Sequence, residues 1–407
     1  MGGVEQHHIK TLWERTMNAQ LSTKSSTTPR SQSTPWFHTA EELLNNLGSL
    51  FADRAFDFDT NCTFVQKNYN DLKEARFFSL AIPVELGGGG LTYGELCQVT
   101  QQLAHYCGST ALAFAMHSHP VALNVFKAQR GDERAQATLQ KIAANELIIA
   151  GTGANDWLAS SGTAEVVEGG YLINAHKRFV SGGPGAQVLV SSVNHQSPTG
   201  DEVIHFSLPI SSEGIRVQNN WKTLGMRGTG SNDVILENVF LPEQAIVARR
   251  PAGVWHPMWD AILPHAMPLI TSCYFGMAEK AFELALEASR NKPSVANLVG
   301  TLHNQLTTAR LAVEDMVRCQ DNYGFTPSRE LTDAILTRKT IANQAIRNVV
   351  DQASVLAGGS GFFQGHPLER IIRDVRAMHF HPLPEHKQVT FSGRLLMDLD
   401  PICELTQ

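Results

Sequence analysis

Hydrophobic positions divide the chain into two helical blocks with a strand-rich block between them. Over 39–148, apolar residues recur at three- and four-residue intervals, most clearly in Tyr93–Tyr106 and Thr110–Gln129, which is the period of amphipathic helices. Between 149 and 250 the runs are short and alternate between apolar and polar residues, as half-buried strands do. These runs are Tyr171–Asn174, Arg178–Ser181, Val188–Val193, Val203–Leu208, Ile215–Val217 and Asp233–Phe240.

Helical periodicity returns over 251–407. The expected helices are Met258–Asn291, Val295–Tyr323, Ser328–Leu356 and Glu385–Leu399. Pro264 and Pro268 are expected to kink or split the first of these, because proline removes a helical hydrogen bond. The pattern therefore predicts an α+β multidomain protein with domains at 39–148, 149–250 and 251–407.

The first 38 residues show no such periodicity. The segment Leu21–Pro35 is rich in serine, threonine and proline, and it has too few apolar side chains to form a core. We expect 1–38 to be a disordered tail. A first helix is expected to open near Thr39, where T-A-E-E-L-L offers a threonine cap.

Composition narrows the possible partners. The 407 residues are 43% hydrophobic and 18% charged, and the net charge of -6 gives no electrostatic reason for binding nucleic acid or an anionic membrane. The six cysteines are scattered without a C-x-x-C pair, which argues against a zinc site and fits a reducing compartment. No apolar run is long enough to span a bilayer, and the N-terminus lacks a signal-peptide core. The sequence predicts a cytoplasmic protein without a metal.

The stretch Tyr171–Gly183, Y-L-I-N-A-H-K-R-F-V-S-G-G, carries the first candidate chemistry. Phe179 and Ser181 stand two positions apart, so in a strand they share a face. That face would offer a flat aromatic ring and a hydroxyl beside glycines that allow close approach, as a flat heteroaromatic cofactor requires. An ordinary sheet, with Phe179 in the core and Ser181 in solvent, is the alternative interpretation.

Two glycine-rich loops and several histidines add weaker signals. The loops begin at Thr152 and at Leu224 (L-G-M-R-G-T-G-S), and such loops can hold phosphate through backbone N–H groups, but neither has the G-x-G-x-x-G spacing. His117 and His119 do not share a helical face, which disfavours a metal site. The segment His366–Pro384 gathers three arginines and three histidines, which suits an anionic ligand better than most of the chain.

Four motifs in order resemble the acyl-CoA dehydrogenase superfamily over about residues 40–400. They are P-V-E-L-G-G-G-G at Pro83–Gly90, L-I-N-A-H-K-R-F-V-S-G-G at Leu172–Gly183, L-G-M-R-G-T-G-S at Leu224–Ser231 and G-G-S-G-F…H-P-L-E-R-I-I-R-D at Gly358–Asp374. The resemblance implies an N-terminal helical domain, a central β-barrel or sandwich domain and a C-terminal four-helix bundle. It also implies a homotetramer, or a homodimer, that binds flavin.

The resemblance places several residues at the cofactor. Phe179 and Ser181 are expected against the isoalloxazine ring, with Gly182 and Thr152 beside it. Gly358 and Gly359 are expected near the phosphate. The family's R-x-x-F-G motif becomes Arg290-Asn291-Lys292-Pro293-Ser294, so the adenine half of FAD would be held poorly. This departure favours FMN, or a flavin that is supplied already reduced.

A second departure concerns the catalytic base. A dehydrogenase of this family needs a carboxylate to remove the proton α to the thioester carbonyl. Counting along the motifs, the two usual positions of that carboxylate hold Pro382 and Ala266, and neither residue can act as a base.

With a histidine near the position of the missing carboxylate, the chain resembles the flavin-dependent monooxygenase branch of the superfamily, of the dibenzothiophene monooxygenase type. Members of this branch take reduced flavin from a separate reductase and use O₂ to oxygenate a sulfur, nitrogen or aromatic carbon. The resemblance gives Ser181, His381 and His117 as catalytic residues, with His379 as a rival for the role of His381.

Three functions remain open at this stage. The first is a two-component monooxygenase acting on a small hydrophobic, aromatic or heteroatom substrate. Such a substrate is suggested by the apolar, aromatic-rich segments Ala113–Phe126 and Trp255–Tyr274. The second is an acyl-CoA dehydrogenase with FAD and a displaced base, for which Glu385 is the candidate. The third is a non-catalytic protein that uses the fold as a scaffold.

Overall fold

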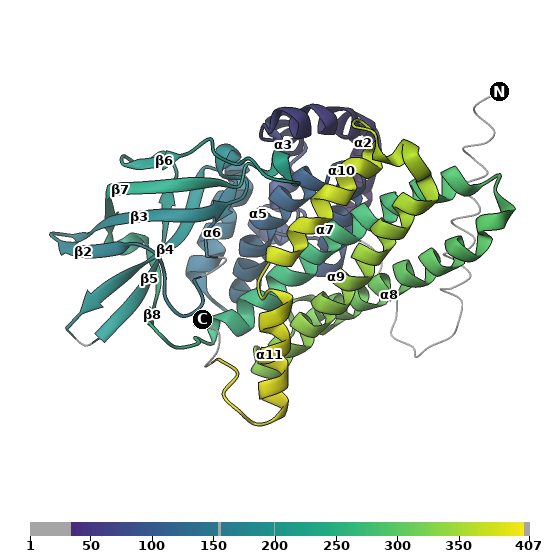
Figure 1. Ribbon diagram of the computed structural model, residues 1–407. Helices are drawn as coiled ribbons and strands as arrows, with labels where there is room; N and C mark the ends of the chain where they lie inside the picture. Colours follow the sequence, from purple (N-terminus) through teal and green to yellow (C-terminus); the bar gives the residue numbers. More distant parts are fainter. Residues whose placement is uncertain (1–33, 154–155, 199, 403–407) are drawn as a thin grey trace. The chain divides into compact units, whose positions relative to one another are not determined.

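The computed structural model describes residues 34–153, 156–198 and 200–402 (Figure 1). Residues 1–33 of the expected tail lie outside the described residues. The expected end of the tail, at residue 38, is wrong. Helix α2 (Pro35–Asn61) begins at Pro35 and not near Thr39. The reason is local, because proline is favoured in the first turn of a helix, and Thr34 lies at the N-cap. Thr39 instead bonds back to the Pro35 carbonyl inside the first turns.

The N-terminal domain continues with four more helices. They are α3 (Gln66–Glu74), α4 (Tyr93–Tyr106), α5 (Gly108–Ala128) and α6 (Glu133–Asn145). A capping box fixes the start of α4, since Thr92 and Glu95 exchange side-chain to backbone hydrogen bonds. Helix α5 is buried along most of its length and packs against α4, α6, α7 and β1, so it lies between the sheet and the C-terminal helices (Figure 1).

Eight strands form one mixed sheet. They are β1 (Ile149–Gly151), β2 (Thr163–Val167), β3 (Gly170–Val180), β4 (Val188–Ser197), β5 (Gly200–Pro209), β6 (Ile215–Val217), β7 (Asn232–Pro242) and β8 (Ile246–Pro251). The order is β6-β7-β3-β2-β4-β5-β8, and β1 pairs in parallel with β4. The sequence pattern missed β1, β2 and β8, and it divided the continuous strand β3 into two pieces.

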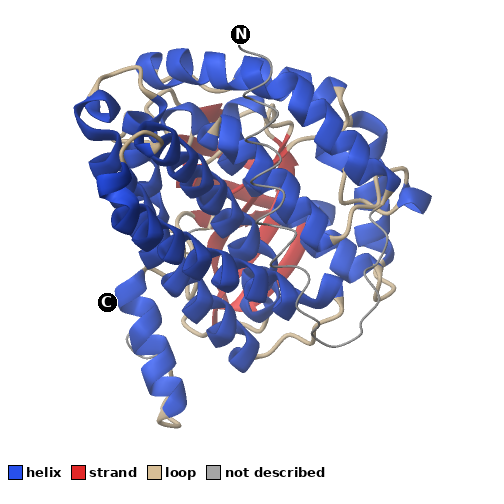
Figure 2. Ribbon diagram, turned by 90° about the vertical axis from the view of Figure 1, so that its right-hand side faces the viewer, coloured by secondary structure: helices blue, strands red, loops and turns tan. Residues whose placement is uncertain are grey.

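The C-terminal domain is helical, as expected. Helices α7 (Met258–Ser289), α8 (Ala296–Gln320) and α9 (Arg329–Ala357) pack against one another, and α10 (Pro367–Asp374) and α11 (Glu385–Leu396) pack on α9. Figure 2 shows these helices in front of the sheet. None of the described helices is long and apolar enough to cross a membrane.

Helix α7 is not split by its two prolines. Pro268 has no N–H to donate to the Pro264 carbonyl four residues earlier. The Tyr93 hydroxyl of α4 donates chiefly to the His265 oxygen, at 2.7 Å, and shares its proton with the Pro264 oxygen, at 3.3 Å. A side chain from another helix therefore compensates for the proline, and α7 continues.

One arginine contacts all three domains. The Arg373 guanidinium of α10 forms two hydrogen bonds of 2.9 and 2.6 Å with the Asp59 carboxylate of α2. It also donates to the Leu224 carbonyl, which follows the sheet strand β6, at 3.1 Å. Gly225 allows this approach, because a Cβ there would lie 2.3 Å from the Arg373 oxygen.

Candidate functional site

The end of β3 presents an aromatic ring and a row of hydroxyls. Phe179 is 49% exposed, and its ring meets that of Trp221 in an edge-type contact with 5.4 Å between centroids. The Ser181 hydroxyl lies 2.7 Å from that of Ser231, which lies 2.7 Å from that of Thr229. The pairing of β3 with β7 is irregular between Lys177 and Val180, and β3 ends at Val180. The strand argument for a shared face therefore does not apply to Ser181.

Gly182 turns the chain away after this row. Its φ is +74°, a conformation that glycine adopts without strain, and its N–H donates to the Thr229 carbonyl at 2.9 Å. A Cβ at this position would lie 3.1 Å from the Tyr69 hydroxyl. Trp221 also lines a hollow of about 370 Å³, whose other walls include Phe64, Gly183, Pro184, Gln218, Gly230 and Asn232.

Thr152 lies directly after β1, which pairs with β4. Its hydroxyl is 2.7 Å from the Ser191 hydroxyl, and its N–H donates to the Val190 carbonyl at 3.0 Å. Both contacts are with β4. Thr152 is thus held at the edge of the sheet, at the start of the segment that leads to β2.

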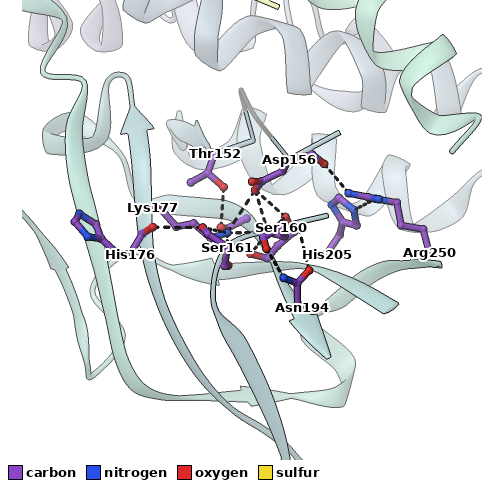
Figure 3. Close-up of polar contacts among 11 residues, drawn as sticks. Thr152, Asp156, Ser160, Ser161, His176, Lys177, Asn194, His205 and Arg250 are labelled. Carbon is purple, nitrogen blue, oxygen red and sulfur yellow. Dashed lines mark hydrogen bonds and ion pairs between the residues drawn. The ribbon is translucent and has the colours of Figure 1, made fainter. Parts of the chain in front are cut away.

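A buried lysine holds the far part of that segment (Figure 3). Lys177 is 1% exposed, and its ammonium donates to the Ser160 hydroxyl at 2.8 Å and to the carbonyl and hydroxyl of Ser161 at 2.8 and 3.0 Å. The Asp156 carboxylate lies 3.4 Å away and also accepts from Ser160 and Ser192. Burial lowers the pKa of Lys177, and Asp156 opposes that shift.

Arg250 binds the same segment from β8. Its guanidinium donates to the Asp156 carbonyl at 2.6 Å (Figure 3) and to the Leu158 carbonyl at 2.9 Å. Its Nε donates to Nε2 of His205 at 3.1 Å, so that nitrogen carries no proton. Burial, followed by the charge of Arg250, lowers the pKa of His205 to about 3. The sequence pattern identified none of these residues, because their partners lie on separate strands.

Three tryptophans pack where this segment meets α7. The rings of Trp157 and Trp255 are stacked with 5.8 Å between centroids, and the Trp259 indole donates to the Trp157 carbonyl at 2.8 Å. The Trp255 indole donates to Asp260 at 3.2 Å. Trp255 and Trp259 belong to the aromatic-rich segment that suggested a hydrophobic substrate, and both are buried and hydrogen-bonded within this cluster.

His381 is held inside the C-terminal domain. Its Nε2 lies 2.7 Å from the Tyr274 hydroxyl of α7, and its carbonyl accepts from the Lys339 ammonium of α9 at 2.8 Å. Burial, with a smaller contribution from Lys339, lowers the pKa of His381 to about 3. The imidazole is therefore neutral at physiological pH.

Two nearby residues, His379 and Glu385, were alternative candidates for the proton-transfer role, and their surroundings differ from those of His381. His379 is half-buried, and burial together with Arg347 and Arg376 lowers its pKa. Glu385 begins α11, and its carboxylate accepts from the Gln344 amide at 2.7 Å. Ala266, at the other usual position of the base, is buried in α7.

His117 has no free ring nitrogen. Its Nε2 donates to the Phe78 carbonyl at 2.8 Å, and its Nδ1 accepts the N–H of Ile149 at 3.0 Å. Burial lowers the pKa of His117 to about 4. In this arrangement the side chain ties α5 to β1 and to the Phe77–Ser79 turn, and it is not directed at a ligand.

This arrangement predicts acid sensitivity. The neutral ring of His117 stabilises the fold fully above about pH 6.5, and this contribution is lost as the pH falls through about 4, because the unfolded chain binds the proton more readily. The expected loss is about 3 kcal/mol. We expect His117→Gln to show a flatter dependence in urea unfolding between about pH 7.5 and about pH 4.5. Equal slopes for the two proteins would contradict this role.

Arg290, Gly358 and Gly359 lie elsewhere. Arg290 is exposed and caps the end of α7. Gly358 and Gly359 are exposed after α9, and Gly358 has φ +66°. Phe179, Ser181 and Gly182 thus lie together at the end of β3 and Thr152 lies after β1, all in the sheet domain, whereas His381 and these three residues belong to the helical domain. Among the described residues, no cluster of histidine, cysteine and carboxylate side chains could hold a metal.

Comparison with known proteins agrees with this architecture. Three family models match in order: the acyl-CoA dehydrogenase N-terminal domain at 47–146, the middle domain at 150–239 and the C-terminal domain at 271–384. The chain belongs to the acyl-CoA dehydrogenase family. The resemblance seen in the motifs and the expected three-domain fold are thereby confirmed.

The relatives include oxygenases and dehydrogenases. L-evernosamine nitrososynthase of a Micromonospora species is 27% identical over 86% of this chain and 88% of its own length. Dibenzothiophene monooxygenase of Mycolicibacterium goodii is 24% identical over 82% of this chain and 87% of its own. Plant isovaleryl-CoA dehydrogenases also match. The solved structure of KijD3 with FMN and a dTDP-amino sugar has a TM-score of 0.82 at 22% identity, covering 92% of this chain and 97% of that one. The expected class, a flavin-dependent oxidoreductase, is confirmed.

Proposed function

We propose that the protein is the oxygenase component of a two-component system, which uses reduced flavin and O₂ to oxygenate a small hydrophobic or heteroatom substrate. The observation that carries this proposal is the pair of positions that lack the dehydrogenase carboxylate. Pro382 and Ala266 cannot remove a proton, and the polar side chain next to the first of them is a half-buried, neutral histidine hydrogen-bonded to Tyr274.

The residues at the end of β3 fit a flavin. Phe179 offers an exposed aromatic ring, Ser181 offers a hydroxyl and Gly182 allows close approach, and Thr152, after β1, offers a further hydroxyl. Reduced flavin, when bound, supplies the electrons that activate O₂. We assign to Ser181 a hydrogen bond to the flavin ring and to Phe179 a stacking surface.

His381 would handle the proton. If Tyr274 donates to Nε2, the neutral ring carries its proton on Nδ1, which is then free to donate to a substrate or oxygen species. His117, with both nitrogens bonded to the backbone, contributes by fixing α5 against the sheet.

FMN suits this chain better than FAD. Arg290 is exposed, and the residues after it depart from the family motif that holds the dinucleotide.

Exposed large hydrophobic side chains on the C-terminal domain support a homotetramer or homodimer, because a soluble monomer rarely exposes so many. They include Leu311, Val355, Phe362, Phe363, Phe380 and Leu396. A separate reductase and a cytoplasmic location are part of the same proposal.

An acyl-CoA dehydrogenase with a displaced base is the second candidate, because dehydrogenases are among the relatives. It needs Glu385 to act as the base. The Gln344 amide already binds that carboxylate at the start of α11, so Glu385 would have to leave this partner before it could reach a substrate.

One experiment separates the candidates. The purified protein is titrated with FMN and with FAD, and then supplied with an unrelated flavin reductase, NADH, O₂ and either indole, dibenzothiophene, primary amines or acyl-CoA thioesters. We expect FMN to bind, and an oxygenated product to form from a heteroatom or aromatic compound. Dehydrogenation of a thioester with dye reduction would establish the second candidate. Binding of neither flavin would leave only the scaffold.

Replacing Ser181 by alanine tests the placement of the flavin. We expect FMN affinity to fall about fivefold, because a hydrogen bond to a polar ligand contributes about 1 kcal/mol. The free energy of unfolding should change by less than about 1 kcal/mol, since the hydroxyl only meets Ser231 in a half-buried position. Ser207→Ala, on the sheet strand β5, is the matched control. Unchanged FMN affinity in Ser181→Ala would remove this residue from the site.

A further inference from the structure

Lys339 is a buried amine in the middle of α9. Its side chain is 3% exposed, and its ammonium donates to two main-chain oxygens, those of His381 at 2.8 Å and of Leu383. These two carbonyls flank Pro382, which occupies the position of the missing carboxylate. Lys339 therefore contacts the backbone of the segment that carries the proposed proton donor.

His381 is thus held from two helices. Tyr274 of α7 binds the imidazole, and Lys339 of α9 binds the carbonyl of the same residue. The segment His381–Pro384 lies between two helical elements and has no regular backbone ladder of its own. The contacts from α7 and α9 consequently determine the direction of the imidazole.

Packing alone does not explain a lysine at this position. A charged amine in a buried site destabilises the fold relative to an apolar side chain of similar length. Burial lowers the pKa of Lys339 to about 7, and Glu385 opposes this shift. What lysine adds over methionine is the ability to donate to two carbonyls.

We propose that Lys339 is a positioning residue, which holds the main chain at His381 and Leu383 so that the His381 ring keeps its contact with Tyr274 and its orientation toward the reaction. This inference rests on the proposed function of His381. Lys339 itself does not touch the substrate or the flavin. Its effect on the reaction passes through His381.

A dependence on pH follows from the charge of the amine. The titratable groups that face it are Glu385 on α11, and His379 and His381 on the connecting segment. As the pH rises through about 7, the folded protein loses the Lys339 proton. Its two hydrogen bonds then change from charge-assisted to neutral and weaken. The fraction of reduced flavin that yields product should therefore fall above about pH 7.

The variant Lys339→Met tests the inference, because it keeps the length of the side chain and removes the donors. Arg338→Met is the matched control, since Arg338 is the next residue of α9 and pairs with Asp315 of α8 instead. We expect Lys339→Met to release about tenfold more H₂O₂ per product at about pH 6.5, because a misplaced reacting group is costly. The dependence above about pH 7 should disappear. Arg338→Met should behave as the unmodified protein does.

A double-mutant cycle asks whether Lys339 acts through His381. In a His381→Ala background, adding Lys339→Met should change the H₂O₂ to product ratio by less than about twofold. An equal effect of Lys339→Met in both backgrounds would overturn the inference. So would a Lys339→Met protein that forms as much product per reduced flavin as the unmodified protein at every pH. Lys339→Arg retains hydrogen-bond donors, so it should recover part of the product yield per reduced flavin if the larger guanidinium fits.

Two measurements on the flavin-free protein keep this inference separate from the proposed function. With ¹⁵N-labelled histidine, the His381 signal should move in Lys339→Met and stay in place in Arg338→Met. The unfolded lysine keeps its proton to about pH 10.5 while the folded one loses it near 7, so the unmodified protein should gain stability relative to Lys339→Met as the pH rises between these values. Absent shifts would overturn the inference, whereas a lack of flavin binding alone would overturn only the proposed function.

Discussion

Replacing His381 by alanine is expected to lower product formation about 100-fold while FMN still binds. The magnitude is that of a lost proton donor in general acid catalysis. The imidazole contacts Tyr274 in the helical domain, whereas the proposed flavin residues lie at the end of β3. Removing the ring should therefore leave the flavin contacts intact and leave the reduced flavin to react unproductively with O₂.

The measurement follows product, H₂O₂ and FMN affinity in parallel. His386→Ala is a suitable control, because His386 is an exposed histidine on α11 close by in the sequence. His379→Ala decides between the two rival histidines. If His379→Ala loses product formation and His381→Ala retains it, the proton-donor role belongs to His379. Full turnover in both variants would exclude a histidine from this role.

Removing the carboxylate of Asp156 is expected to destabilise the protein by about 3 kcal/mol, because it leaves a buried charge without its counter-ion. Lys177 is 1% exposed and has Asp156 as its carboxylate neighbour at 3.4 Å. The hydroxyls of Ser160 and Ser192 would lose the same acceptor. The segment after Thr152 should loosen, so FMN affinity should fall as well.

Chemical denaturation of Asp156→Ala measures this cost. Asp201→Ala removes an exposed carboxylate from β5 and is the control. Asp156→Asn keeps hydrogen-bonding groups and loses the charge, so its free energy of unfolding should lie between those of Asp156→Ala and Asp201→Ala. The double variant Asp156→Leu, Lys177→Met should recover much of the stability, because paired buried charges can be replaced by apolar groups. A loss below about 0.5 kcal/mol in Asp156→Ala would show that the serines alone neutralise Lys177.

Local pattern was sufficient for the helices and for part of the sheet. Tyr93–Tyr106 forms a helix with the predicted bounds, since a capping box and an apolar stripe agree there. The strands β1, β2 and β8 were missed because each strand is short or mixes apolar and polar residues, and pairing with neighbouring strands determines their conformation. The prolines of α7 were misleading because the compensating hydroxyl of Tyr93 comes from a distant part of the sequence.

The site shows the same limit. The sequence pointed to Phe179 and Ser181 through a contiguous motif, and the structure places both at one end of β3. It could not reveal that both nitrogens of His117 are bonded to the backbone, because one partner lies in the Phe77–Ser79 turn and the other in β1. Lys177 and Lys339 were equally hidden, since a lysine in a sequence is expected in solvent.

The ion pair of Arg373 has a consequence for how the molecule unfolds. Because one guanidinium binds α2, the loop after β6 and Glu369 of its own helix α10 at once, the three sequence domains share a contact that none of them can keep alone. Separate melting of the sheet domain would require breaking that contact first. The three domains should therefore form one cooperative folding unit, with coincident transitions by different probes, and the sheet domain expressed by itself should expose the surface that Arg373 now secures.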